Sequence, residues 1–216
     1  LLAQAAMAAK LDTDPSVDWI STTTVARLVP ERLYEEARVR GAPLDDELAK
    51  VRVIHALVLR SPALHAARGL EVADGILRAV TGARNDAEFE TRTKAMPAPG
   101  AKVIVERLPE FDATGATAEG SEFDATFAAA ALALRTPGET SGIVETPFGW
   151  HVIRLIERVP PDAASLPTRR DALTNAVVQM RARSQLGALI SAYRKRVPVE
   201  VSTGADELMT EAARRP

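Results

Sequence analysis

The stretch "VETPFGWHVIRL" (Val144–Leu155) joins a tight aromatic turn to the start of an apolar strand. Gly149 stands between Phe148 and Trp150, where it can adopt backbone angles that a side chain would forbid. His151 follows at once and leads into aliphatic residues typical of a buried strand. Because a buried imidazole needs hydrogen-bond partners, the pattern predicts that a second polar side chain meets His151 inside the fold.

A second histidine lies in "VRVIHALVL" (Val51–Leu59), where both alternating faces are largely apolar, as in a central strand. If this strand neighbours a strand over 150–159, His55 and His151 can face each other. Each neutral imidazole offers one donor and one acceptor, so the two can share a proton while Thr146 satisfies an outer nitrogen. We weigh a structural role for this pair evenly against a catalytic one, because perturbed pairs also occur for structural reasons.

The elements between these strands predict an α+β module of order β-α-α-β-α-β-β from about 51 to 159. Ser61-Pro62 opens a helix that ends near Gly82, and Asn85 or Asp86 caps a shorter one. The remaining elements are a strand over "KVIVERLPEF", a helix over about Glu122 to Leu134, and short strands over 142–145 and 150–159.

Helical segments flank this module. We predict an N-terminal arm over 1–50, interrupted at Pro30 or Pro43, and the module itself over 51–159. After a linker at Pro160-Pro161 comes a C-terminal segment over 160–202, with a long helix and the short strand "VPVEVS", and then a tail over 203–216. The first arm is acidic and the last helix basic, which favours their packing into one helical subdomain. The alternative is two independent solvated faces.

Composition excludes several classes of function. The chain has 27 basic and 29 acidic residues among 216, so neither nucleic acid nor an anionic membrane surface is expected as a partner. The absence of cysteine excludes disulfides and zinc–thiolate sites, and three dispersed histidines, of which His65 is expected on a helix surface, do not form a metal site. No cofactor motif, nucleophile elbow or phosphate-binding glycine loop occurs.

Three segments together resemble the parvulin family of peptidyl-prolyl cis/trans isomerases. "VIHALVL" is similar to the family's opening strand with its histidine, and "FDATFAAAALALRTPGETSGIV" to its Phe-rich helix and Gly-Glu-x-Ser turn. "VETPFGWHVIRLIER" is similar to its closing hairpin. The resemblance implies an FKBP-like domain with a four-stranded antiparallel sheet. The flanking helices look like the chaperone arms of exported foldases of the SurA and PrsA type.

The resemblance also implies site residues. Those expected to be catalytic are His55, His151 and Thr146, and those expected to line an apolar slot for proline are Phe123, Phe127, Phe148 and Trp150. For Trp150, which lies on a strand, we favour a place in the core. Parvulins usually carry a Cys or Asp shortly before the second strand, but "MPAPGAK" (96–102) has neither, so we expect an incomplete polar half and weak catalysis.

The expected function is that of a prolyl isomerase and foldase that needs no cofactor and acts on unfolded or proline-containing clients. Only Arg60 follows His55 closely, so recognition of phosphorylated clients is not expected. One alternative is a non-catalytic chaperone or peptide-binding module with a degenerate parvulin domain, and another is an assembly partner whose arms form a homodimer. The resemblance implies an exported, periplasmic or membrane-anchored protein outside the cytoplasm. "LLAQAAMAAK" carries no leader, but the sequence begins without Met, so this absence carries little weight.

Overall fold

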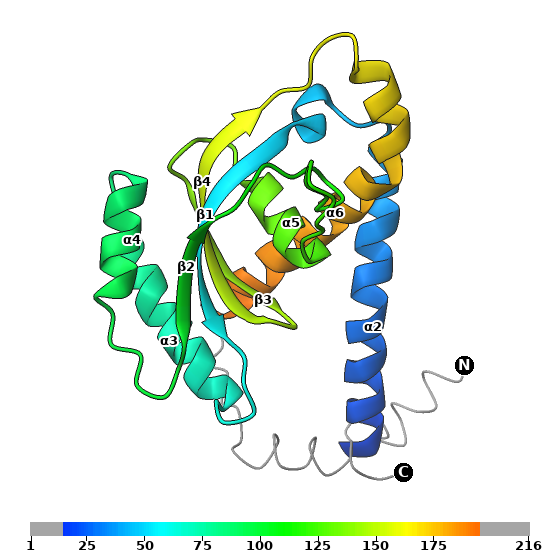
Figure 1. Cartoon of the computed structure of the whole chain (residues 1–216). Coiled ribbons are helices and arrows are strands. Elements are labelled where there is room, and N and C mark those ends of the chain that lie inside the picture. Colours follow the sequence, from blue (N-terminus) through cyan, green and yellow to red (C-terminus); the bar gives the residue numbers. More distant parts are fainter. Residues whose placement is uncertain (1–14, 195–216) are drawn as a thin grey trace.

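The computed structural model describes residues 15–194, so the predicted strand "VPVEVS" and the tail lie outside the described part of the chain. The elements, shown in Figure 1, are α2 (Pro15–Val39), the short 3-10 helix η2 (Asp45–Leu48), β1 (Lys50–Leu59), α3 (Ala66–Val80), α4 (Asp86–Lys94), β2 (Val103–Arg107), α5 (Ala125–Ala133), β3 (Thr140–Thr146), β4 (Gly149–Val159) and α6 (Leu166–Arg194). Their order confirms the predicted α+β fold.

The four strands form one antiparallel sheet in the order β2-β1-β4-β3. β1 lies in the centre, which explains why both of its faces are apolar. The register pairs His55 with Ile153 and Leu57 with His151, so the two histidines occupy diagonal positions on one face.

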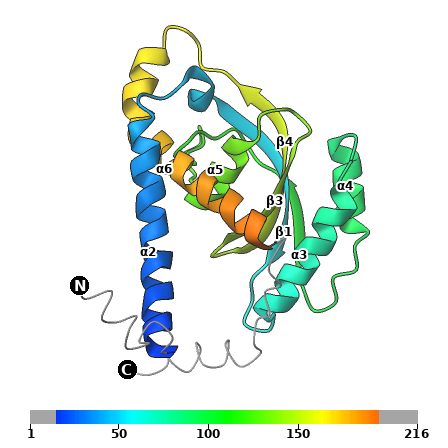
Figure 2. The ribbon, with the colours of Figure 1, turned by 180° about the vertical axis from the view of Figure 1, so that it is seen from behind.

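Helices cover both faces of the sheet. α3 and α4 lie on one side and α5 and α6 on the other, with α2 outside α6 (Figures 1 and 2). The alternation of side chains along each strand therefore supplies two cores. Buried residues on the α3 side include Ile54, Val58, Ile76, Phe89 and Trp150, and those on the α5 side include Val51, Val53, Phe111, Phe127, Leu132 and Ile153.

The aromatic turn that joins β3 to β4 depends on Gly149. This residue has a φ of 143°, and a Cβ built on it would lie 2.0 Å from the carbonyl oxygen of Val58. Only glycine fits there. The next residue, Trp150, turns to the other face, where its ring packs so closely on Gly69 of α3 that a Cβ at Gly69 would lie 2.2 Å from it.

The N-terminal helix does not break at Pro30, one of its two predicted interruptions, because α2 runs through this proline to Val39. Beyond Pro30, Ala37 and its neighbours pack against Val178 and Ala182 of α6. This packing holds the last turns of α2 although Pro30 removes one helical hydrogen bond. The chain leaves the helix at Gly41, whose φ is 82°, shortly before Pro43.

A buried ion pair joins the two arms to each other. The Arg181 guanidinium of α6 donates to both carboxylate oxygens of Glu47 in η2 at 2.7 and 2.5 Å, and also to the Gly41 carbonyl at 2.9 Å. Burial raises the pKa of Glu47, but hydrogen bonds from Arg181 and from the backbone N–H of Leu44 outweigh it, so this pKa lies below its usual value. The arms are thus joined by one desolvated ion pair, beside the more exposed pair of Arg170 with Asp45.

α6 also belongs to the core of the parvulin-like module. Its buried Leu173, Val177 and Met180 join the same apolar cluster as Phe127 and Leu132 of α5. The boundary at 160 stays a prediction, but the apolar contacts cross it. None of the helices in the described residues is long and apolar enough to cross a bilayer.

We predict that Arg181→Met lowers the free energy of unfolding by about 3–5 kcal/mol, because it leaves the Glu47 carboxylate buried without its partner. The matched control is Arg170→Met, which breaks the more exposed ion pair with Asp45 and should cost less than about 1 kcal/mol. Urea unfolding followed by circular dichroism measures both. Equal losses in the two variants would show that the buried pair does not fasten the arms.

Candidate functional site

The two predicted histidines meet on the α5 face of the sheet. The Nδ1 atoms of His55 and His151 lie 3.2 Å apart, and the rings are nearly parallel, with centroids separated by 5.4 Å. Each residue is only 4% exposed. The diagonal positions on β1 and β4 bring the rings together.

Both outer nitrogens also have partners. His151 Nε2 lies 2.8 Å from the hydroxyl of Thr146 at the end of β3, and that hydroxyl accepts the backbone N–H of Phe148 at 3.2 Å. At the other end, His55 Nε2 lies 3.2 Å from the Oε1 atom of Glu106 on β2. No imidazole nitrogen of the pair is left without a partner.

The two ends fix the direction of this hydrogen-bond chain. An ionised carboxylate only accepts, so His55 donates from Nε2 to Glu106, and a neutral His55 must then accept at Nδ1. His151 therefore donates from Nδ1 and accepts the Thr146 hydroxyl at Nε2. With both imidazoles neutral, the hydroxyl proton is directed inward because its oxygen already accepts the Phe148 N–H.

Burial keeps the imidazoles neutral. It lowers the pKa of His55, against the opposing effect of Glu106. Burial, helped by the neighbouring His55, lowers the pKa of His151 to about 4, although the Asp124 carboxylate acts in the opposite direction. At neutral pH the pair is therefore uncharged, and Glu106 is the charged end of the chain.

An aromatic cluster covers the pair. The Phe127 ring points edge-on at both imidazoles, with centroid distances of 5.2 Å to His55 and 5.1 Å to His151. Asp124 caps α5 by accepting the N–H groups of Thr126 and Phe127, which fixes the start of the helix. Phe127 is only 3% exposed, and its ring centroid lies 5.9 Å from that of Phe123. Phe123 is half-buried and presents the accessible surface of the cluster.

Two predicted slot residues lie outside this cluster. Trp150 is buried in the core on the α3 side, the place we favoured from its strand position, and the Arg60 guanidinium lies 4.6 Å from its ring centroid. Phe148 is 60% exposed in the turn between β3 and β4. The structure thus brings together five of the seven predicted residues: His55, His151, Thr146, Phe123 and Phe127.

Glu106 is the residue that the sequence prediction missed. The resemblance places a Cys or Asp before the second strand, at "MPAPGAK", whereas the structure supplies a carboxylate from within β2, directly opposite His55 in the register. Glu106 thus supplies a carboxylate beside the histidine pair, while "MPAPGAK" still offers neither Cys nor Asp, and the expectation of weak catalysis stays a prediction. The available signal was a lone acidic residue in the apolar strand "KVIVERL".

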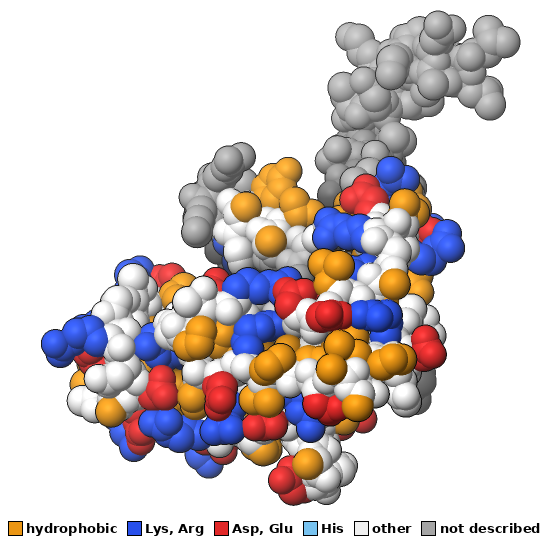
Figure 3. Space-filling model, turned by 90° about the horizontal axis from the view of Figure 1, so that it is seen from above, with side chains coloured by type: hydrophobic (Ala, Val, Ile, Leu, Met, Phe, Trp, Pro, Cys, Tyr) orange, Lys and Arg blue, Asp and Glu red, His pale blue; other side chains and the backbone are white. Residues whose placement is uncertain are grey.

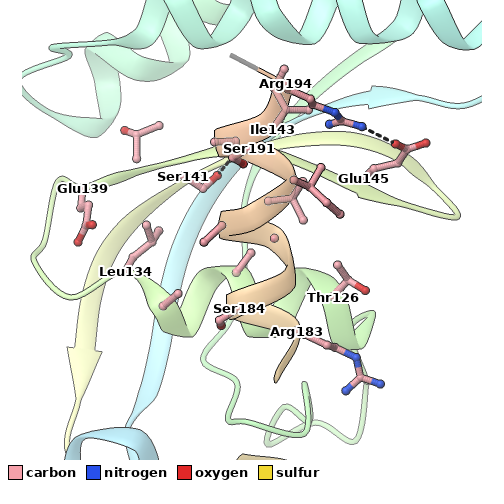
Figure 4. A pocket seen from close by; sticks show the side chains of 18 residues that line it. Thr126, Leu134, Glu139, Ser141, Ile143, Glu145, Arg183, Ser184, Ser191 and Arg194 are labelled. Atoms are coloured by element: carbon pink, nitrogen blue, oxygen red, sulfur yellow. Dashed lines mark hydrogen bonds and ion pairs between the residues drawn. The ribbon is translucent and has the colours of Figure 1, made fainter. Parts of the chain in front are cut away.

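A groove on the described surface lies away from these residues. It has a cavity volume of about 360 Å³ and runs between α5, β3 and α6 (Figure 4). Its walls carry small and hydroxyl side chains such as Ser184 and Ser191, and Arg194 pairs with Glu145 at one end. None of the seven predicted site residues lines it.

The distribution of charged and metal-ligating side chains bears on which ligands the described residues could hold. On the face shown in Figure 3, basic and acidic side chains are interspersed, and neither sign forms a broad patch. Within residues 15–194, no three His, Asp or Glu side chains gather in a way that could hold a metal ion.

We predict that the free energy of unfolding falls as the pH is lowered from about 6.5 towards 4. In this window the unfolded chain protonates the imidazole of His151, whose ordinary pKa is 6.5, while the folded chain does not. Because the pKa of His151 is lowered in the folded chain, the free energy of unfolding falls by roughly 3 kcal/mol by pH 4. Urea unfolding at half-unit pH steps measures this. The double variant His55→Asn, His151→Asn should lose the slope between pH 6.5 and 5, and an unchanged slope would contradict a neutral pair.

Comparison with known proteins gives one family match and several similar solved structures. Residues 71–171 match the family model of the PPIC-type PPIase domain, and no curated protein matches. Solved structures include PrsA from Bacillus subtilis, at 16% identity and a TM-score of 0.33, covering 95% of this chain and 77% of that chain. Another is a SurA-like chaperone of Campylobacter jejuni, at 15% identity and a TM-score of 0.23, covering 93% and 81%. At these TM-scores we draw no conclusion from the two structures. The chain therefore contains, over residues 71–171, a domain of the PPIC-type, or parvulin, family of peptidyl-prolyl isomerases.

Proposed function

We propose that this protein is a peptidyl-prolyl cis/trans isomerase that assists folding by binding proline-containing apolar segments of unfolded chains. The observation that carries the proposal is the hydrogen-bond chain Thr146–His151–His55–Glu106 beneath Phe127, in a chain whose residues 71–171 match the PPIC-type domain model. A purely structural pair would need only some acceptor at His55 Nε2, whereas here the acceptor is a carboxylate that is partly open to solvent. The Glu106 side chain is 53% exposed.

The reaction makes modest chemical demands. The X–Pro amide must pass through a twisted state roughly 18–20 kcal/mol above the planar one, and no bond is broken. An enzyme therefore needs no nucleophile or cofactor. It needs an apolar surface for the proline ring, exclusion of water, and polar groups that act differently on the planar and twisted amide.

Each part of the site can meet one of these demands. The half-buried ring of Phe123 offers the apolar surface, and Phe127 forms the floor behind it. The imidazoles hold the Phe127 ring and place the Glu106 carboxylate. Amide resonance puts partial negative charge on the oxygen of the planar amide, and twisting removes this charge. A fixed negative charge beside that oxygen therefore disfavours the planar amide relative to the twisted one.

One observation favours the alternative of a non-catalytic chaperone or peptide-binding module. Phe127 and both histidines are buried, so the cluster is closed in the absence of a client. A protease-coupled assay on a proline tetrapeptide, run beside an aggregation assay on an unfolded client, separates the two functions. Suppressed aggregation without turnover would establish the chaperone and exclude the enzyme.

We extend the proposal to the clients, the location and the oligomeric state of the protein. The resemblance of the arms to those of exported foldases suggests clients among exported proteins and a location outside the cytoplasm, which the gene's upstream codons would test by encoding a signal peptide or not. A homodimer formed through the arms stays a proposal, which sedimentation can test. In the described structure, α2 and α6 pack on each other within one chain.

We predict that Phe123→Ala lowers turnover of a proline tetrapeptide roughly tenfold, because it removes about 1.4 kcal/mol of apolar contact with the proline ring. Since Phe123 is half-buried, this variant should stay folded. Phe127→Ala should instead lower the free energy of unfolding by about 3–5 kcal/mol, because it leaves a cavity in the core. The control is Tyr193→Ala, an aromatic residue on α6 that is 63% exposed. Full turnover in Phe123→Ala would place the proline elsewhere.

A further inference from the structure

Two carboxylates flank the accessible side of the histidine pair. Glu106 engages His55 through Oε1, its side chain is 53% exposed, and no hydrogen bond engages its second oxygen within the described residues. Asp124, between the two phenylalanines of the cluster, uses only Oδ1 to cap α5, and its charge acts on His151. Both carboxylates thus keep an oxygen that a client can meet.

The basic side chains near this side of the pair are either paired with other carboxylates or distant from the two carboxylates. Arg60 pairs with Glu145 and lies over Trp150, and Arg107 pairs with Asp86. Lys102 shares the face of Glu106, but four residues of extended chain, roughly 13 Å along the backbone, separate them. The field over the cluster is therefore negative.

We infer that the site selects proline-containing segments with a lysine or arginine next to the proline, an inference that rests on the proposed function. If the proline ring lies on Phe123, with Phe127 behind it, the rings of Phe127 and His55 connect it to Glu106, because the centroids of these two rings lie 5.2 Å apart and His55 Nε2 lies 3.2 Å from the carboxylate. A neighbouring residue begins about 3.8 Å along the chain. From a residue on either side of the proline, the long side chain of lysine or arginine can reach the carboxylate of Glu106.

The same field acts against acidic neighbours. A glutamate or a phosphorylated residue beside the proline would add negative charge next to Glu106 and Asp124, and no free cation lies close to receive it among the described residues. At the dielectric of a protein surface, one pair of opposite charges at such distances changes affinity by roughly three- to tenfold. The difference between lysine and glutamate at one position should therefore exceed tenfold.

The test uses the full chain and two peptide series, Ala-Xaa-Pro-Phe and Ala-Pro-Xaa-Phe, with Xaa as Lys, Ala or Glu. Exchange spectroscopy by NMR gives the isomerisation rate, and titration gives the affinity. We expect the order Lys, Ala, Glu in at least one series, with a Lys-to-Glu ratio above tenfold at low salt that shrinks in 0.5 M NaCl. The salt dependence separates a charge effect from a difference in side-chain length.

Variants assign the effect to the carboxylate. Glu106→Gln should reduce the Lys-to-Glu ratio severalfold and Glu106→Lys should invert it, whatever either does to the rate on the alanine peptide. The control is Glu90→Gln on α4, across the sheet, which should leave the ratio unchanged. A ratio near one in both series, with the alanine peptide still bound, overturns the selectivity while the proposed function stands. Failure to bind any of the peptides overturns both.

Discussion

The hydrogen bond between the Nδ1 atoms of His55 and His151 constrains the structure more than any other contact. Two buried imidazoles facing each other can be satisfied only if one donates and the other accepts. That requirement demands the pairing of β1 with β4, an acceptor beyond His55 and a donor beyond His151. Glu106 and Thr146 meet it from the two outer strands, so every strand of the sheet contributes to one polar chain.

The site is supported from behind by the arms as well as by its own strands. Phe127, which rests on both imidazoles, belongs to a core that α6 completes with Leu173, Val177 and Met180. α6 is in turn tied to the N-terminal arm through Arg181 and Glu47. Because these contacts are continuous, a change in the packing of the arms would reach the floor of the aromatic cluster, and client binding and the site can be coupled through packing alone.

Local patterns in the sequence predicted much of this arrangement. The element order, the pairing of the histidines and the role of Thr146 follow from strand patterning and from the need to satisfy a buried imidazole. The place of Trp150 follows from parity, since it is adjacent to His151 on a strand and must face the other way. Glu106 could not be placed, because its position opposite His55 depends on the register between β1 and β2, which no turn specifies. The uninterrupted passage of α2 through Pro30 depends on contacts with α6 that are equally non-local.

The most direct test is the protonation of the two imidazoles in the folded protein. Long-range ¹H–¹⁵N correlation spectra at pH 7 distinguish the two neutral tautomers from each other and from imidazolium. The hydrogen-bond chain predicts two neutral rings of opposite tautomer, with the proton on Nε2 in His55 and on Nδ1 in His151. A charged ring at either residue, or the same tautomer at both, would contradict the directed chain from Thr146 to Glu106.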